Sequence, residues 1–244
     1  MKKLLLVSVI LLAAVMALAV PAVADTSMTD KYISVAGYGE SETTPDVVTL
    51  NLGVSTENTN AAKAQSENRD TMNRVISALK SAGIAADDIS TNGYSMYSYT
   101  VSEYDEGVYK AGTIVYRVSN QISVKTSKVE SAGSYIDTAV SAGANTVNNV
   151  VFSLSNAKYL EERKHALTAA VKSARSDAEA VAGALGLSLK GTGVITIDQS
   201  YVPVAYNTPM PVMTKEYAVT GDSSTAIQAG TLKTTATVSI TYLY

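Results

Sequence analysis

The chain has 244 residues, of which 46% are hydrophobic and 17% are charged, and its formal net charge is −3. That length accommodates one large domain or two small ones, and this composition argues against intrinsic disorder. The chain has no cysteine and a single histidine, His165. Disulfides, cysteine catalysis and cysteine-based zinc sites are therefore excluded.

The first 24 residues have the pattern of a secretory signal peptide. Lys2 and Lys3 precede an apolar run that reaches Val20, and residues 22–24 read Ala-Val-Ala, a cleavage motif. We therefore expect an exported protein, in a periplasm or at a cell surface, with no membrane span once the segment is cleaved. A retained anchor is the alternative. Cleavage makes the chain more acidic, and it has no Lys/Arg cluster, so no nucleic-acid partner is expected.

The first half of the mature chain alternates between strand and helix patterns. Apolar alternation over residues 33–37 and 48–54 predicts two strands separated by Pro45. Helical spacing from Asn58 to Gly83 predicts an amphipathic helix. Residues 89–99 and 113–125 return to strand alternation.

The second half continues the alternation. Residues 129–143 predict a helix, residues 147–155 a strand and residues 156–185 a long helix. The predicted buried stripe of this long helix comprises Leu160, Leu167, Val171, Ala174, Ala178, Val181 and Leu185. Strands at 194–197 and 232–242 complete the chain.

The element order ββαββαβαβ(β)β indicates an α+β fold, in which amphipathic helices pack on a mixed, largely antiparallel sheet. We expect a single domain over residues 25–244. Ser-Ala-Gly occurs at residues 81–83 and again at 141–143, each time at a predicted helix end. This echo is compatible with an internal helix–strand repeat and equally with ordinary helix capping.

Tyrosine is unusually abundant, with 15 residues, and it crowds around one predicted hairpin. Three prolines over residues 200–216 predict a long loop or arm that also carries tyrosine and methionine. Tyrosine suits strands, but it is also enriched in protein interfaces and glycan-stacking surfaces, so both plain surface and contact surface remain open. The candidate interaction surface comprises Tyr94, Tyr97, Tyr99, Tyr104, Tyr109, Tyr201, Tyr206, Met210 and Met213.

The remaining polar groups do not form a readable catalytic or metal-binding motif. His165 lies among charged residues, off the predicted buried stripe, and the acidic clusters lack the spacing of a calcium loop. We therefore predict no catalytic residue, no cofactor and no bound metal. A hydrolase that uses Glu103 or Asp105 is kept as an alternative.

Several short motifs, in a fixed order, resemble the SIMPL-domain family of exported proteins. They occupy residues 33–39 with 45–46, 79–84 with 88–91, 116–124, 141–145 with 150–154, 169–186, and 227–230 with 238–242. The family includes periplasmic immunogenic and oxidative-stress-defence proteins and is largely of unknown function. The resemblance implies an α+β fold and, from some members, large ring-like or channel-like homo-oligomers. It brings no catalytic residues to carry over.

The function favoured at this point is that of an exported, self-associating protein of the cell envelope or surface. Its role would be structural or protective against stress, including oxidative stress, and not enzymatic. The alternative is a binding module whose tyrosine-rich hairpin receives a peptide, a glycan or an envelope protein.

Overall fold

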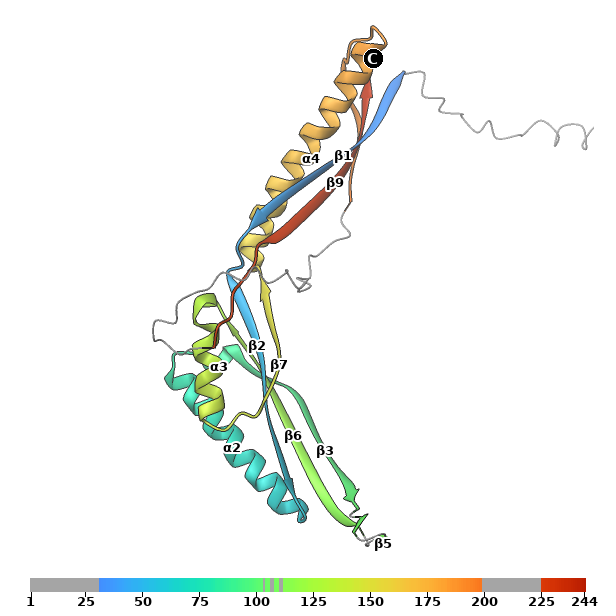
Figure 1. The fold of residues 1–244 in the computed structure, drawn as a ribbon. Coiled ribbons are helices and arrows are strands. Elements are labelled where there is room, and N and C mark those ends of the chain that lie inside the picture. The colour runs from blue at the N-terminus through green and yellow to red at the C-terminus, as the bar shows by residue number, and fades with distance from the viewer. Residues whose placement is uncertain (1–30, 103, 106–107, 110–111, 199–224) are drawn as a thin grey trace, which may run out of the picture.

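The computed structural model describes residues 31–102, 104–105, 108–109, 112–198 and 225–244. These residues form two helix-and-sheet halves that lie end to end in an elongated molecule (Figure 1). The terminal half combines β1, α4, β8 and β9, and the central half combines the elements between β2 and β7. The predicted signal peptide and the 200–216 arm lie outside the described residues.

The terminal half contains a three-stranded sheet in the order β1-β9-β8. Its strands are β1 (Tyr32–Thr43), β9 (Leu232–Leu243) and β8 (Gly191–Ile197), and both pairings are antiparallel. β1 and β9 pair without a break, from Tyr32 opposite Leu243 to Thr43 opposite Leu232. The two ends of the described chain are therefore held together in one sheet.

Helix α4 (Asn156–Ala184) packs on this sheet through small residues. Ala166, Ala170, Ala174, Ala178 and Ala182 are its buried residues. They face Gly37 and Gly39 of β1, where an added Cβ would lie 2.0 Å and 2.1 Å from backbone oxygens of the helix. The backbones of β1 and α4 therefore lie closer together than larger side chains would allow.

The predicted stripe of larger side chains on this helix was wrong. Leu160, Val171, Val181 and Leu185 are each at least 42% exposed. Ala174 and Ala178 of the predicted stripe are buried, and Leu167 packs at the edge of the core. The glycine–alanine contact selects the face of the helix that has the smallest residues, whereas hydrophobic periodicity favours the face that has the largest.

The central half contains a four-stranded antiparallel sheet in the order β3-β6-β2-β7. Its strands are β3 (Ile89–Val101), β6 (Thr113–Thr126), β2 (Val47–Asn58) and β7 (Thr146–Ser153). Helices α2 (Ala61–Ser81) and α3 (Ala132–Ser141) cover one face of it (Figure 1). The 3₁₀ turns η1 (Ala86–Asp88) and η2 (Val129–Ser131) connect these elements.

Strict alternation along β2 builds the core of the central half. Val48, Leu50, Leu52 and Val54 are buried against the two helices, and the residues between them face the opposite, helix-free side of the sheet. Met72, Val75 and Leu79 supply the matching face of α2. We call the helix-free side the open face.

The Ser-Ala-Gly repeats end α2 and α3 in the same way. Gly83 and Gly143 have φ values of +97° and +115°, which glycine tolerates best. The amide of the following residue, Ile84 or Ala144, donates back to Leu79 or Ala139 in each case. These are Schellman caps, as the capping interpretation of the echo predicts. An internal repeat stays a prediction.

Two sets of hydrogen bonds join the halves. Asp46, between β1 and β2, accepts bonds from the amide and the hydroxyl of Ser155, both at 2.6 Å, and Ser155 in turn caps α4. In the second set, Thr225 donates from its amide and hydroxyl to Asp137 of α3, at 2.9 Å and 2.5 Å. The chain leading into β9 is thereby tied to the central half.

The α+β class and the element order are confirmed, with two features beyond the prediction. The strands form two main sheets, and a two-residue hairpin of β4 (Tyr104–Asp105) and β5 (Val108–Tyr109) extends the tip. That residues 25–244 make a single domain stays a prediction. Within the described residues, no helix has the length and apolar character that crossing a membrane requires.

Candidate functional site

The structure separates the tyrosines that the sequence placed on one surface. Tyr94, Tyr97 and Tyr99 all lie on β3, but side chains alternate along a strand, so Tyr94 faces α2 while Tyr97 and Tyr99 lie on the open face. Tyr104 pairs with Tyr109 across the small β4–β5 hairpin. Tyr201, Tyr206, Met210 and Met213 lie outside the described residues.

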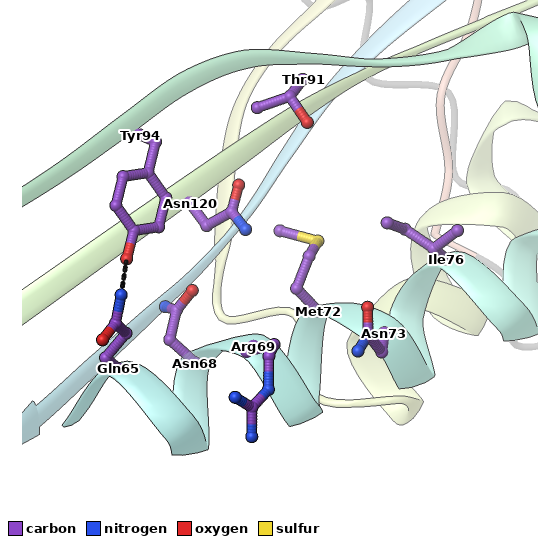
Figure 2. Close-up of a pocket in the computed structure, with 9 residues that line it drawn as sticks. All are labelled: Gln65, Asn68, Arg69, Met72, Asn73, Ile76, Thr91, Tyr94 and Asn120. Atoms are coloured by element: carbon purple, nitrogen blue, oxygen red, sulfur yellow. Dashed lines mark hydrogen bonds between the residues drawn. The ribbon is translucent and has the colours of Figure 1, made fainter. Parts of the chain in front are cut away.

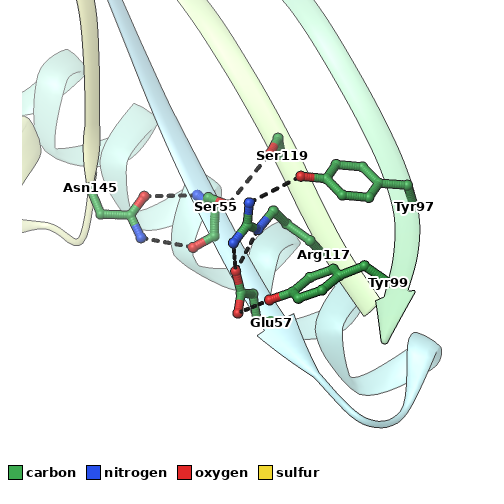
Figure 3. A network of polar contacts seen from close by, with 7 residues as sticks. All are labelled: Ser55, Glu57, Tyr97, Tyr99, Arg117, Ser119 and Asn145. Carbon is green, nitrogen blue, oxygen red and sulfur yellow. Dashed lines mark hydrogen bonds and ion pairs between the residues drawn. The ribbon is translucent and has the colours of Figure 1, made fainter. Parts of the chain in front are cut away.

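Tyr97 and Tyr99 enclose an arginine on the open face, in a group that we call the Arg117 cluster: Glu57, Tyr97, Tyr99 and Arg117 (Figure 3). The guanidinium carbon of Arg117 lies 5.9 Å from the ring centre of Tyr97 and 5.2 Å from that of Tyr99, both within cation–π range. The two ring centres are 6.3 Å apart. Three neighbouring strands, β2, β6 and β3, therefore contribute to one cluster.

Glu57 is the second polar centre of the cluster. It forms an ion pair and a hydrogen bond with Arg117 and accepts a 2.8 Å hydrogen bond from the Tyr99 hydroxyl. Arg117 also donates to the Tyr97 hydroxyl at 3.0 Å. Every member is thus bonded to at least one other, although the Glu57 and Arg117 side chains remain 40% and 38% exposed.

These bonds fix the charge of the cluster. The hydrogen bond from Tyr99, followed by that from Arg117, holds the pKa of Glu57 below its ordinary value. The same bond to Glu57 raises the pKa of Tyr99, and bonds to Tyr97 and Glu57 raise that of Arg117. At neutral pH the cluster therefore presents a carboxylate, a guanidinium and a neutral Tyr99 phenol.

Asn145 forms hydrogen bonds with the backbone of β2 next to the Arg117 cluster. Its side-chain amide accepts from the amide of Ser55 at 2.8 Å and donates to the carbonyl of Ser55 at 2.7 Å (Figure 3). The hydroxyl of Ser55 lies 3.4 Å from that of Ser119 on β6. The backbone of β2 beside the cluster is therefore held by Asn145 on one edge and by its pairing with β6 on the other.

The composition and geometry of the Arg117 cluster suit a binding surface better than a catalytic site. Tyrosine and arginine are enriched at the centres of protein interfaces, and here they form a hydrogen-bonded, partly exposed surface. The Glu57 carboxylate already accepts hydrogen bonds from Tyr99 and Arg117, and its pKa is lowered, which opposes a general acid role at neutral pH.

The groups considered for catalysis are dispersed. His165 is exposed on α4, in the terminal half. Asp105 lies in β4 at the opposite tip, and Glu103 lies outside the described residues. The hydrolase alternative stays a prediction. The described residues considered for it do not lie close together.

Sequence reasoning missed Glu57 and Arg117, yet a signal for them exists. The two residues stand opposite one another in the antiparallel pairing of β2 and β6. Opposite charges at directly paired positions attract. Pairing the two predicted strands in this register would have found them, but the sequence alone does not say which strands are neighbours.

A second exposed feature lies in the terminal half. β8 is an edge strand, and Val194, Ile195 and Ile197 on it are 44–55% exposed. Ile195 and Ile197 stand opposite Ile240 and Val238, which are buried under α4. Paired residues share a face of the sheet, so the apolar core continues outward onto an uncovered edge among the described residues.

Comparisons with known proteins agree with the motifs in the sequence. The family model described as SIMPL, a protein of unknown function (DUF541), matches residues 33–242. The 26 kDa periplasmic immunogenic protein of Brucella melitensis is 30% identical over 205 residues, which cover 81% of this chain and 78% of that protein. The protein of the same name in Brucella abortus has the same identity and coverage. Uncharacterized protein YggE of Edwardsiella ictaluri is 26% identical over 159 residues, or 65% of this chain and 64% of that protein.

Proposed function

Because this chain belongs to the SIMPL family, we propose that it is an exported, self-associating protein of the cell envelope with a structural or stress-protective role and no catalytic activity. Export is supported by the signal-peptide pattern of residues 1–24 and by relatives whose names describe them as periplasmic. Self-association is supported by an exposed strand edge in the terminal half.

The exposed edge of β8 is the observation that carries this proposal. Among the described residues, β8 pairs only with β9, so its other edge offers unpaired backbone groups. That edge is flanked by Ile195 and Ile197, whereas isolated edge strands usually carry charges that prevent pairing. A strand from a second copy would satisfy the backbone and cover the two isoleucines together.

Solution mass tests the proposal directly. The chain beginning at Asp25 is expected to sediment as an assembly at micromolar concentration, and the double variant Ile195→Lys/Ile197→Lys is expected to sediment as a monomer, because two buried charges would oppose association. Ala62→Lys, at an exposed position of α2 in the other half, is the matched control and should leave the mass unchanged. A monomeric wild-type chain would contradict self-association.

The Arg117 cluster favours a second candidate function, a binding module for a peptide, glycan or envelope protein. Tyr97 and Tyr99 are expected to supply its contact surface. Changing both to serine should abolish cross-linking to partners from an envelope extract while leaving the far-UV circular dichroism intact, because the two side chains lie on an exposed face. Tyr38→Ser removes an exposed ring from β1, in the other half of the molecule, and serves as the control. Equal capture by all three proteins would remove this candidate.

A further inference from the structure

A pocket lies between helix α2 and the helix-facing side of β3 and β6 in the central half (Figure 2). Its volume is about 420 Å³, within the range of small-molecule sites and far above the roughly 30 Å³ that one water occupies. Its lining includes Gln65, Asn68, Met72, Ile76, Tyr94 and Asn120. The Arg117 cluster occupies the opposite face of the same sheet.

Asn68 gives this pocket a fixed hydrogen-bond acceptor. The residue is 1% exposed, and its side-chain nitrogen donates to the carbonyls of Val54 and Val118 at 2.8 Å and 3.0 Å. Rotating the amide would set its oxygen against those two carbonyl oxygens, so the observed orientation is enforced. The Oδ1 atom of Asn68 is buried and has no donor among the described residues.

Asn120 supplies a second acceptor of the same kind. It lies on β6, and its Oδ1 atom is likewise buried without a donor in the described part of the chain. Figure 2 shows both amides projecting into the space between the helix and the sheet. Buried polar atoms are almost always hydrogen-bonded, so two unpaired acceptors in one pocket indicate an occupant that donates.

The rest of the lining restricts the charge of that occupant. None of the lining residues is acidic, and the one charged side chain, Arg69, donates to Asp70 and Ser66 on its own helix. An ammonium group would find no counter-charge among these residues, and an anion would face two carbonyl oxygens. The lining therefore suits a neutral ligand.

The remaining side chains define its shape. Met72, which is 3% exposed, and Ile76 form an apolar wall. Tyr94, 53% exposed, stands on the opposite side, where its hydroxyl accepts a long 3.5 Å bond from Gln65 (Figure 2). Amides and hydroxyls that both donate and accept, beside an exposed ring, match a molecule with several hydroxyl groups and an apolar C–H face.

We propose that this pocket binds a neutral sugar of monosaccharide size, whose hydroxyl groups donate to Asn68 and Asn120. The site lies in the central half, apart from the β8 edge to which self-association is assigned. A protein that binds no sugar can therefore still self-associate, and a monomeric protein can still bind sugar.

Side-chain amide resonances provide the test. D-glucose, D-galactose and N-acetyl-D-glucosamine are each titrated into ¹⁵N-labelled protein through the millimolar range. At least one sugar is expected to shift the side-chain amide signals of Asn68 and Asn120 saturably. Glycerol serves as a comparison that has hydroxyl groups but no ring, and it should bind more weakly.

Two variants separate a binding role from a structural one. Asn120→Leu removes one acceptor and should weaken sugar binding about tenfold, the effect of one lost hydrogen bond. It should leave the melting temperature unchanged or higher, because an unpaired buried acceptor is removed. Asn148→Leu makes the same change at an exposed position of β7 and should alter neither property.

Two outcomes would overturn the proposal. One is the absence of a saturable shift at Asn68 and Asn120 with all three sugars, which would leave water as the occupant. The other is a loss of binding in Asn148→Leu equal to that in Asn120→Leu, which would place the sugar elsewhere on the protein.

Discussion

Asp46 is a single residue that acts on both halves of the molecule. Burial by itself would raise the pKa of this carboxyl group, but the hydroxyl and amide bonds from Ser155, aided by Lys158, bring the pKa below its ordinary value. A depressed pKa in the folded state means that the ionised group stabilises the fold. The side chain of Lys158 adds a 2.7 Å bond to the carbonyl of Thr44 at the same junction.

Asp46→Asn is expected to destabilise the protein by about 1–2 kcal/mol at neutral pH, because charge-assisted bonds to Ser155 become neutral ones. The stabilisation from Asp46 is present above the unfolded pKa of about 3.9 and is lost as the pH falls through the lower folded pKa. The difference in urea unfolding between wild type and variant should therefore shrink in acid. Asp87→Asn, an exposed change in η1, should show no such pH dependence, and a difference that persists in acid would contradict this role.

At the residue scale, the sequence indicates candidate contact residues, but it does not indicate which of them lie together in the fold. Tyrosine abundance and strand alternation are local properties, so a role for Tyr97 and Tyr99 on one face of β3 could be anticipated. Their partners Glu57 and Arg117 are brought to them only by the pairing of β2 with β6 and of β6 with β3. Asn68 would ordinarily be assigned to the solvated side of a helix, and only the contact of α2 with two strand carbonyls explains its burial.

At the scale of elements, the packing of α4 on β1 depends on two strand positions that have no side chain. Gly37 and Gly39 are buried beneath the alanine stripe of α4. An added methyl group at Gly37 would also lie 2.7 Å from the Cβ of Ala174, so the helix would have to move away from the sheet. Such overpacking outweighs the entropy that an alanine saves in the unfolded chain.

Gly37→Ala is therefore expected to destabilise the protein by about 1–3 kcal/mol, measured by chemical unfolding. Gly193→Ala on β8 is the matched control, because its added methyl group would come no closer than 3.6 Å to any neighbour. The control should be neutral within about 0.5 kcal/mol. Equal stability of the two variants would show that α4 adjusts its distance from β1 at little cost.

The same contact explains why element boundaries were easier to predict than the buried face of α4. The helix occupies Asn156–Ala184, as its periodicity and the following Gly186 indicate. Its buried face depends on the two glycines of a strand more than a hundred residues earlier, and helical periodicity carries no information about that partner. The exposed Leu160, Val171, Val181 and Leu185 are left on the outer side of the terminal half.

At the scale of the whole molecule, the two halves are held by segments that cross between them. Residues 225–231, which precede β9, run from α3 to the terminal half: Thr225 donates to Asp137, and Ile227 packs against the central core. Gly133 of α3 lies directly beneath it, and an added Cβ there would come within 2.0 Å of the carbonyl oxygen of Thr225. The close fit of this segment therefore depends on the absence of a side chain at Gly133.

Gly133→Ala is expected to lift the segment away from α3 without unfolding either half. Alanine favours the helix itself by roughly 0.5–1 kcal/mol, so α3 should persist while the amides of residues 225–231 exchange faster with deuterium. The bonds from Thr225 hold the pKa of Asp137 below its ordinary value, and their loss should let that pKa rise. Gly183→Ala in α4 is the control, since no atom lies within 4 Å of the added methyl group. That variant should gain stability with unchanged exchange at 225–231. Unchanged exchange in Gly133→Ala would mean that the segment accommodates the added methyl group and that its fit on α3 does not depend on Gly133.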